Sequence, residues 1–211
     1  MKIPSPYRSY PPGWATFDQY VMVAGADRLG FSGSTADVNR FAARYRAAKC
    51  FSRVEFEELT AATADGYSSL VQLLLSYSAF EHFMRCIGTT LKQSHALLRD
   101  SERDGALVKL RSLQGQAALF SNLHQHLDPQ YKRQVDAHLK NGLCNPFYLA
   151  AGIRHAFAHG ILTASPGNIP QQSVATVCRF LSRVLFRVMD REFGSRMDSF
   201  EDGLARVHNG G

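Results

Sequence analysis

An arginine and two histidines lie close together in an otherwise apolar run, LAAGIRHAFAHGIL, at residues 149–162. They are Arg154, His155 and His159. A guanidinium binds phosphate or carboxylate oxygens through paired hydrogen bonds, and an imidazole exchanges a proton near neutral pH. This segment could therefore bind an anion and move a proton beside it, which makes it the first candidate for chemistry.

The element that must position these residues is a helix. Asn145-Pro146 is a strong helix start, because asparagine caps well and proline suits the first helical position, and Gly160 suits a left-handed C-terminal residue. At about 100° per residue, one arc of this helix should face the core, and Arg154 lies within it. The polar ridge on the opposite side contains Tyr148, His155 and His159.

A second anomaly lies in LVQLLLSYSAFEHFMRCIG, residues 70–88, where Glu81 falls in the middle of the strongest apolar stripe of the chain. An unpaired buried charge costs several kcal/mol, so an ionised carboxylate there needs a partner. Arg154 has the complementary anomaly, and its planar fork can hold a carboxylate while other donors stay free. We therefore predict that Glu81 pairs with Arg154.

The spacing of Arg154 and His159, with the string IRHAFAHG around them, resembles the R-x4-H signature of the HEPN superfamily of helical proteins. His155 directly after the arginine and Gly160 directly after the final histidine agree with that signature. SYSAFEHF also looks like the earlier helix of such domains, in which an acidic side chain approaches the arginine; this would be the role of Glu81. The resemblance covers roughly residues 50 to 190. Ile161 stands where one toxin branch has a tyrosine, which argues against that branch.

The resemblance implies a metal-independent endoribonuclease that cleaves single-stranded RNA without a cofactor, as a toxin or defence effector. His159 would be the general acid or base, with His155 and Glu81 beside it, and Arg154 would hold the phosphate. Ideal helix geometry separates Arg154 and His159 by about 140°, so they point in different directions. The family's usual arrangement, a homodimer with facing motif helices, would bring both along one cleft, and an antitoxin or regulatory protein is a further expected partner.

The net charge of +6 and pI near 9.3 would help to attract a polyanion. Arginines recur every four residues on the last predicted helix, and we predict that three of them bind RNA together with Tyr148 of the ridge: Arg179, Arg183 and Arg187. A solvated helix face is the alternative explanation of such a pattern.

Two other functions stay open. His155 and His159 are i and i+4 and could share a zinc ion, although HAFAH lacks the glutamate of H-E-x-x-H and no third ligand is evident, so we predict no metal site. The second alternative is a non-catalytic HEPN-like module that binds RNA, a nucleotide or a protein partner.

Helical periodicity without strand alternation predicts an all-α, up-and-down helical bundle with an N-terminal extension. The resemblance implies that this bundle is HEPN-like. We expect an extended N-terminal arm over residues 1–16, flanking helices over 17–50, the bundle over 51–193 and a C-terminal tail over 194–211. The helices expected within these limits span 17–29, 35–49, a long pattern at 53–98 broken near Gly66 or Gly88, 105–126, 129–139, one from 146 and 171–193.

The start of the chain lacks the apolar region of a signal peptide, and no run approaches the roughly 18 apolar residues of a membrane span. We therefore expect a cytoplasmic protein with no membrane partner. The four cysteines have no C-x-x-C pair and are expected to be reduced core thiols. His124, His126 and His138 are expected at the surface.

Overall fold

The computed structural model describes residues 7–167, 169–170 and 172–209, which form helices and connecting segments without a strand and confirm the all-α class. The helices are α1 (Trp14–Ala24), α2 (Thr35–Cys50), α3 (Ala61–Cys86), the short 3-10 helix η1 (Ser94–Leu97), α4 (Asp100–Arg111), α5 (Gln116–His124), α6 (Pro129–Leu139), α7 (Pro146–Ala158) and α8 (Ser173–Asn209).

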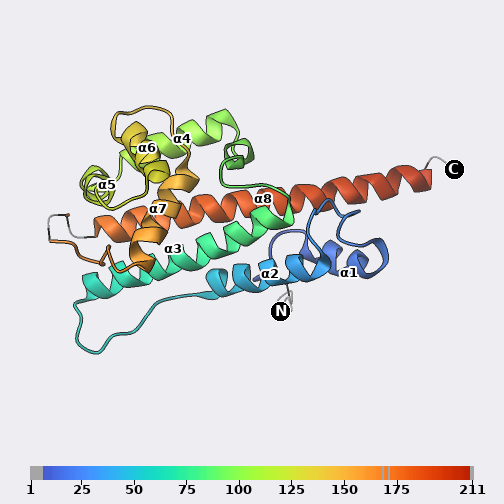
Figure 1. Cartoon of the computed structure of the whole chain (residues 1–211). Coiled ribbons are helices and arrows are strands. Elements are labelled where there is room, and N and C mark those ends of the chain that lie inside the picture. Colours follow the sequence, from blue (N-terminus) through green and yellow to red (C-terminus); the bar gives the residue numbers. More distant parts are fainter. Residues whose placement is uncertain (1–6, 168, 171, 210–211) are drawn as a thin grey trace.

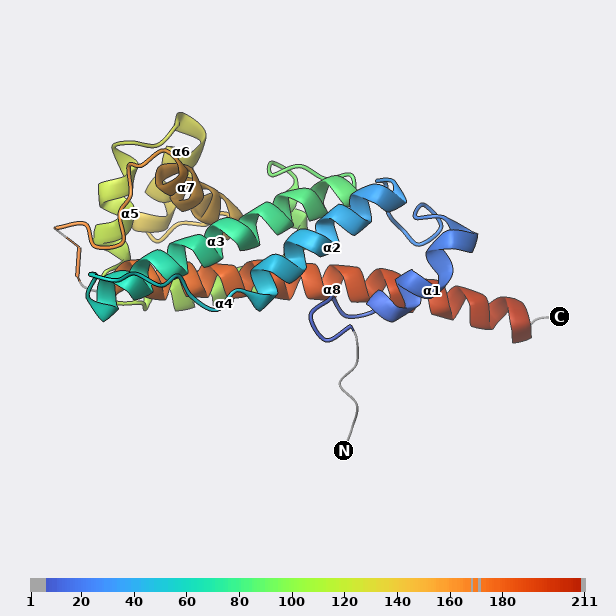
Figure 2. The same ribbon diagram turned by 90° about the horizontal axis from the view of Figure 1, so that it is seen from below.

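The frame of the molecule consists of α2, α3 and α8, which lie side by side along its length (Figures 1 and 2). Helix α2 runs antiparallel to α3, whereas α3 and α8 run in the same direction (Figure 1). An ion pair between Asp65 and Arg179 joins the early turns of α3 and α8. The order is therefore not a simple alternation of up and down, because residues 87–172 must return along the frame, and this return carries α4 to α7.

One continuous apolar core includes the helices that the sequence places at the flank. Phe193 of α8 contacts the rings of Trp14, Phe17, Phe31 and Phe41 at centroid distances of 5.2–6.0 Å. These five side chains are all buried. Because burying a large aromatic ring stabilises a fold by roughly 2–3 kcal/mol, α1 and α2 are structural parts of the bundle rather than additions to it.

Both ends of the described chain differ from the prediction. Residues 1–6 of the expected arm lie outside the described residues, and the part from Tyr7 onward forms turns, with the Tyr10 ring stacked on Trp14 at 4.8 Å. Helix α8 continues through Asn209 instead of ending at Phe193, so most of the predicted tail is helical. The reason is packing against α1, where Phe200 contacts Tyr20 at 5.3 Å. Residues 210–211 also lie outside the description.

Glycines explain where two of the predicted helical segments are interrupted. The helix predicted over 105–126 is two helices, α4 and α5, because Gly115 has a φ of +71° and caps the second. Helix α3 continues through Gly66 and ends before Gly88, whose φ is +67°, so the break lies at the second of the two predicted places. A Cβ atom at Gly66 would lie 2.8 Å from the Cβ of Ala164. Gly66 therefore lets the segment that follows α7 cross closely over α3.

Two predictions about side-chain exposure are also wrong. His138 is buried, with Nε2 at 2.7 Å from Oε1 of Gln116, so it joins α6 to α5 instead of lying at the surface. Burial lowers the pKa of His138 to about 4, which keeps its imidazole neutral. Cys50 is exposed at the end of α2, whereas the other three cysteines are buried thiols as expected.

Within the described part of the chain, none of the helices has the combination of length and apolar character that crossing a bilayer requires.

Candidate functional site

Helix α7 is fixed at its first residue by the side chain and backbone of Asn145. The Asn145 Oδ1 accepts a hydrogen bond from the Phe147 N–H at 3.0 Å, which caps the helix as the sequence predicts. The Asn145 Nδ2 donates to the Ser94 hydroxyl at 2.9 Å, and the Asn145 backbone N–H donates to Gln134 Oε1 at 2.8 Å. One buried residue therefore joins α7 to α6 and to the segment between α3 and α4.

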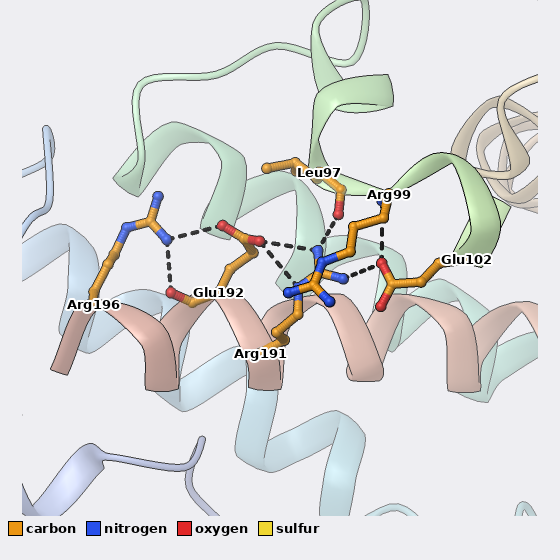
Figure 3. A network of polar contacts seen from close by, with 6 residues as sticks. All are labelled: Leu97, Arg99, Glu102, Arg191, Glu192 and Arg196. Carbon is orange, nitrogen blue, oxygen red and sulfur yellow. Dashed lines mark hydrogen bonds and ion pairs between the residues drawn. The ribbon is translucent and has the colours of Figure 1, made fainter. Parts of the chain in front are cut away.

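The segment between α3 and α4 is held from its other side by α8 (Figure 3). Arg191 donates hydrogen bonds to the carbonyl oxygen of Leu97 and to the carboxylate of Glu102. The same guanidinium contacts Glu192 Oε1 at 2.9 Å. Because Leu97 and Leu98 are also buried, residues 89–98 form a fixed wall beside α7 rather than a loose loop.

Arg154 of α7 lines a cavity of about 270 Å³ behind this wall. The cavity lies between α3, the wall, α6 and α7, and its lining is mixed in charge and polarity: Tyr77, Glu81, Met84, Arg85, Thr89, Thr90, Leu91, Tyr131, Ala151 and Arg154. A pocket with apolar walls and a few convergent polar groups is the ordinary form of a binding site.

The guanidinium of Arg154 has no hydrogen bond or ion pair with any of the described residues. Its Nε is buried and unpartnered, and its nearest aromatic neighbour is Tyr77, whose ring centroid is 6.0 Å from Cζ. Buried donors are almost always paired, because leaving one unpaired costs about 1–3 kcal/mol. A bound anion at this position would pair the guanidinium.

The predicted ion pair between Glu81 and Arg154 is wrong. Glu81 lines the same cavity, but its nearest cation is Arg85, one turn away on α3, at 3.9 Å. The Glu81 side chain is 43% exposed, because it lies at the rim of the cavity rather than in the core. Water therefore solvates this carboxylate, and Arg154 is left without a counter-charge.

Two tyrosines complete the cavity. Burial raises the pKa of both Tyr77 and Tyr131, with further upward contributions from neighbouring groups. Both phenols therefore keep their protons near neutral pH and offer O–H donors. Together with two arginines and two threonines they give the cavity six donor side chains and a single carboxylate, which favours an anionic ligand.

The two histidines lie outside this cavity, on the other edge of α7. The helix ends in a Schellman motif, with the Ile161 N–H bonded to the Ala156 carbonyl at 2.8 Å and Gly160 at a φ of +71°. His159 is the C-cap of α7 and is exposed. Its ring centroid is 4.4 Å from that of half-buried His155. The prediction for Gly160 is confirmed, but Arg154 and His159 do not converge within one chain.

Tyr131 of α6 connects the cavity with the histidines. It lines the cavity, and its ring centroid is 5.8 Å from His155 and 6.2 Å from Tyr148. The predicted ridge of Tyr148, His155 and His159 is thus present on one side of α7, with Tyr131 added to it. Tyr148 also lines a second cavity of about 370 Å³ together with Lys92, His95, Arg103, Gln134, Leu143, Cys144 and Asn145.

The arginines predicted to bind RNA have different surroundings. Arg179 forms an ion pair with Asp65. Arg183 and Arg187 are exposed and line a groove between α4 and α8. Neither of these two has an ion pair or hydrogen bond with the described residues. The groove and the Arg154 cavity have no lining residue in common.

No group of three or more His, Cys, Asp or Glu side chains within the described ranges could hold a metal ion. The adjacent rings of His155 and His159 could offer two ligands, and the sequence prediction of no metal site stays a prediction.

Sequence reasoning missed Tyr77 and Tyr131. Tyr77 belongs to the apolar stripe of residues 70–87, where a tyrosine is expected to be ordinary core. Tyr131 follows Pro129 at the start of a short helix, and no pattern in the sequence connects it with α7. Only the packing of α6 on α7 brings it to the site.

No protein-family model matches the sequence, and no curated protein or solved structure matches the chain.

We predict that Asn145→Ala lowers the free energy of unfolding by about 2 kcal/mol, because it removes a helix cap and a buried hydrogen bond. Ser94→Ala should cost only about 1 kcal/mol, since it leaves the cap in place. Urea unfolding followed by circular dichroism measures both. Equal effects of the two substitutions would show that the cap contributes nothing beyond the bond to Ser94.

Proposed function

We propose that this chain is a HEPN-like, metal-independent endoribonuclease that acts on single-stranded RNA. The observation that carries the proposal is the guanidinium of Arg154, which lines a cavity with a buried, unpartnered Nε and no carboxylate in contact. A phosphate of the RNA backbone matches this group in charge and in hydrogen-bond geometry. The R-x4-H spacing and the helical fold agree with the family that the motif resembles.

The chemistry requires a bound phosphate and a proton carrier. The ribose 2′-hydroxyl loses its proton and attacks the adjacent phosphorus while charge develops on the phosphoryl oxygens. The bond from phosphorus to the 5′-oxygen of the next nucleotide breaks, and this oxygen leaves with a proton, so the products are a 2′,3′-cyclic phosphate and a 5′-hydroxyl. Arg154 stabilises this charge, and the protonated phenols of Tyr77 and Tyr131 supply further donors at the same cavity. In this proposal His159 takes up the proton of the 2′-hydroxyl and delivers a proton to the leaving oxygen.

A homodimer follows from the position of His159. This histidine is exposed and lies outside the cavity of its own Arg154, so within one chain the phosphate site has no imidazole. If two α7 helices face each other across the ridge of Tyr148, His155 and His159, the partner can supply that imidazole. We propose that the site is composite, with Arg154 from one copy and His159 from the other.

The biological setting in this proposal is the cytoplasm. There the protein would be a toxin or defence effector, held in check by an antitoxin or regulatory protein.

The second candidate function is a non-catalytic HEPN-like module that binds RNA, a nucleotide or a protein partner. The separation of His159 from the Arg154 cavity favours it, because an anion site without a nearby acid or base binds but does not cleave.

We predict that the purified protein cleaves single-stranded RNA in the presence of EDTA and that Arg154→Ala and His159→Ala each lower the rate by 100-fold or more, about the contribution of a general acid or a charge-stabilising donor. DNA of the same sequence should stay intact, since it lacks the 2′-hydroxyl. Product formation on a denaturing gel measures the rate.

The matched control for His159 is His126→Ala, because His126 is also exposed and lies outside both cavities. This variant should cleave at the wild-type rate. Equal activity in all four proteins would point to a contaminating nuclease. Binding of RNA without any cleavage by the wild type would favour the second candidate.

The composite site makes a further prediction about mixtures. When Arg154→Ala and His159→Ala chains are mixed in equal amounts and allowed to exchange, half of the dimers are mixed and one of their two sites is intact. Activity should then return to about a quarter of the wild-type value. If each site uses Arg154 and His159 of the same chain, the mixture stays as inactive as its components.

A further inference from the structure

A cationic groove follows one face of α8 and is separate from the Arg154 and His159 motif of α7. Its first part, of about 450 Å³, lies between α4 and α8 and is lined by Lys109, Phe180, Arg183, Val184 and Arg187 among others. Its second part, of about 630 Å³, lies between α2 and α8. Arg183 and Arg187 line both parts, so the two cavities form one groove along the same face of α8.

The charges along this groove are unbalanced. Five cationic side chains line it: Lys49, Lys109, Arg183, Arg187 and Arg191. The two acidic side chains, Glu102 and Asp190, already have partners, because Glu102 pairs with Arg191 and Asp190 lies 3.9 Å from Lys49 Nζ. Lys109, Arg183 and Arg187 form no ion pair with other described residues, so three positive charges remain uncompensated.

Figure 3 shows why Glu102 does not oppose an anion in this groove. Its carboxylate accepts hydrogen bonds from the Arg191 guanidinium and from the Arg99 backbone N–H, the second at 3.1 Å. The bond to Arg191 is the main reason that the pKa of Glu102 is lowered. Glu102 is therefore ionised, and Arg191 of α8 compensates its charge. The potential in the groove is then set by Lys109, Arg183 and Arg187, which have no ion pair with the described residues.

We propose that this groove binds the phosphate backbone of a single-stranded polynucleotide. Arg183 and Arg187 are four residues apart, so their Cα atoms are separated by about 6 Å along the helix axis, a spacing that suits phosphates along a single strand. Guanidinium groups match phosphate oxygens bidentately, and the partly buried ring of Phe180 between them and α4 offers a surface for a base. An acidic peptide could pair with the arginines, but its carboxylates would not stack on the ring of Phe180.

This inference rests on the proposed function only in the choice of RNA as the polynucleotide. The groove has no lining residue in common with the Arg154 cavity, so binding and cleavage are separate properties of the chain. Arg179, which forms an ion pair with Asp65, does not line the groove.

The probe is a fluorescent 2′-O-methyl oligonucleotide of about 12 residues, which is long enough to contact several cations. Its binding to the full chain is measured by fluorescence anisotropy at several salt concentrations. The 2′-O-methyl group prevents cleavage by the proposed mechanism, so the test holds even if the protein is no nuclease. The groove variant is Arg183→Gln with Arg187→Gln. The matched control is Arg28→Gln with Arg206→Gln, which removes the same charge from exposed arginines outside the groove.

The groove variant should bind about 10-fold or more weakly, and the slope of log affinity against log salt should fall by about 1.4, because two phosphate contacts are lost at about 0.7 each. The control pair should stay within about twofold of wild type, since non-specific charge effects there are screened. Equal losses in the two variants would overturn the proposal, and so would poly-glutamate binding as tightly as the oligonucleotide with the same dependence on Arg183 and Arg187.

Discussion

The candidate site depends on one buried asparagine. Asn145 caps α7 through its side-chain oxygen. Its side-chain amide and its backbone N–H also bind Ser94 and Gln134, which fixes the distances from α7 to these two residues. The wall formed by residues 89–98 is also held by Arg191, by the burial of Leu97 and Leu98, and by the Thr89 N–H, which donates to the Met84 carbonyl of α3 at 2.8 Å. Asn145 lines the second cavity, beside Tyr148, and not the cavity of Arg154. It acts on the Arg154 cavity through the elements that it joins, because the wall, α6 and α7 all contribute lining residues there.

The arginines of this chain differ in how their charge is compensated, and this difference separates structural residues from candidate binding residues. Arg191 and Arg179 have carboxylate partners, and Arg191 also binds a backbone carbonyl (Figure 3). Arg154 has neither, although its Nε is buried. A paired arginine fixes two elements together, whereas an unpaired one in a cavity keeps its hydrogen-bond donors for a ligand.

Local signals in the sequence predict much of the fold. The cap at Asn145, the left-handed glycine at 160 and the helical periodicity give α7 and α6 nearly their observed limits. Contacts between distant segments were not predictable in the same way. The extension of α8 depends on packing against α1, and the glycine at position 66 of α3 is explained by the close approach of Ala164. Periodicity reports which face of a helix is apolar, but not which neighbour covers it.

Periodicity also does not tell which side chains meet at the candidate site. Angular position on two helices predicts that Glu81 meets Arg154, yet Glu81 lies at the rim beside Arg85, and Tyr131 from a third helix lines the same cavity. The predicted separation of Arg154 from His159 around the helix is present, and it divides anion binding from the proposed proton transfer. This division is the reason that a second copy enters the proposal.

The most direct test of the account observes Arg154 itself. In ¹⁵N-labelled protein, the Nε–H resonance of Arg154, assigned by its loss in Arg154→Lys, is followed while inorganic phosphate is added. We expect a saturable shift of this resonance, because the phosphate would accept a hydrogen bond from the Nε–H of Arg154, while the resonance of carboxylate-paired Arg191 stays unchanged. An Arg154 resonance that does not move, or that moves no more than that of Arg191, would contradict the proposal that this guanidinium binds an anion.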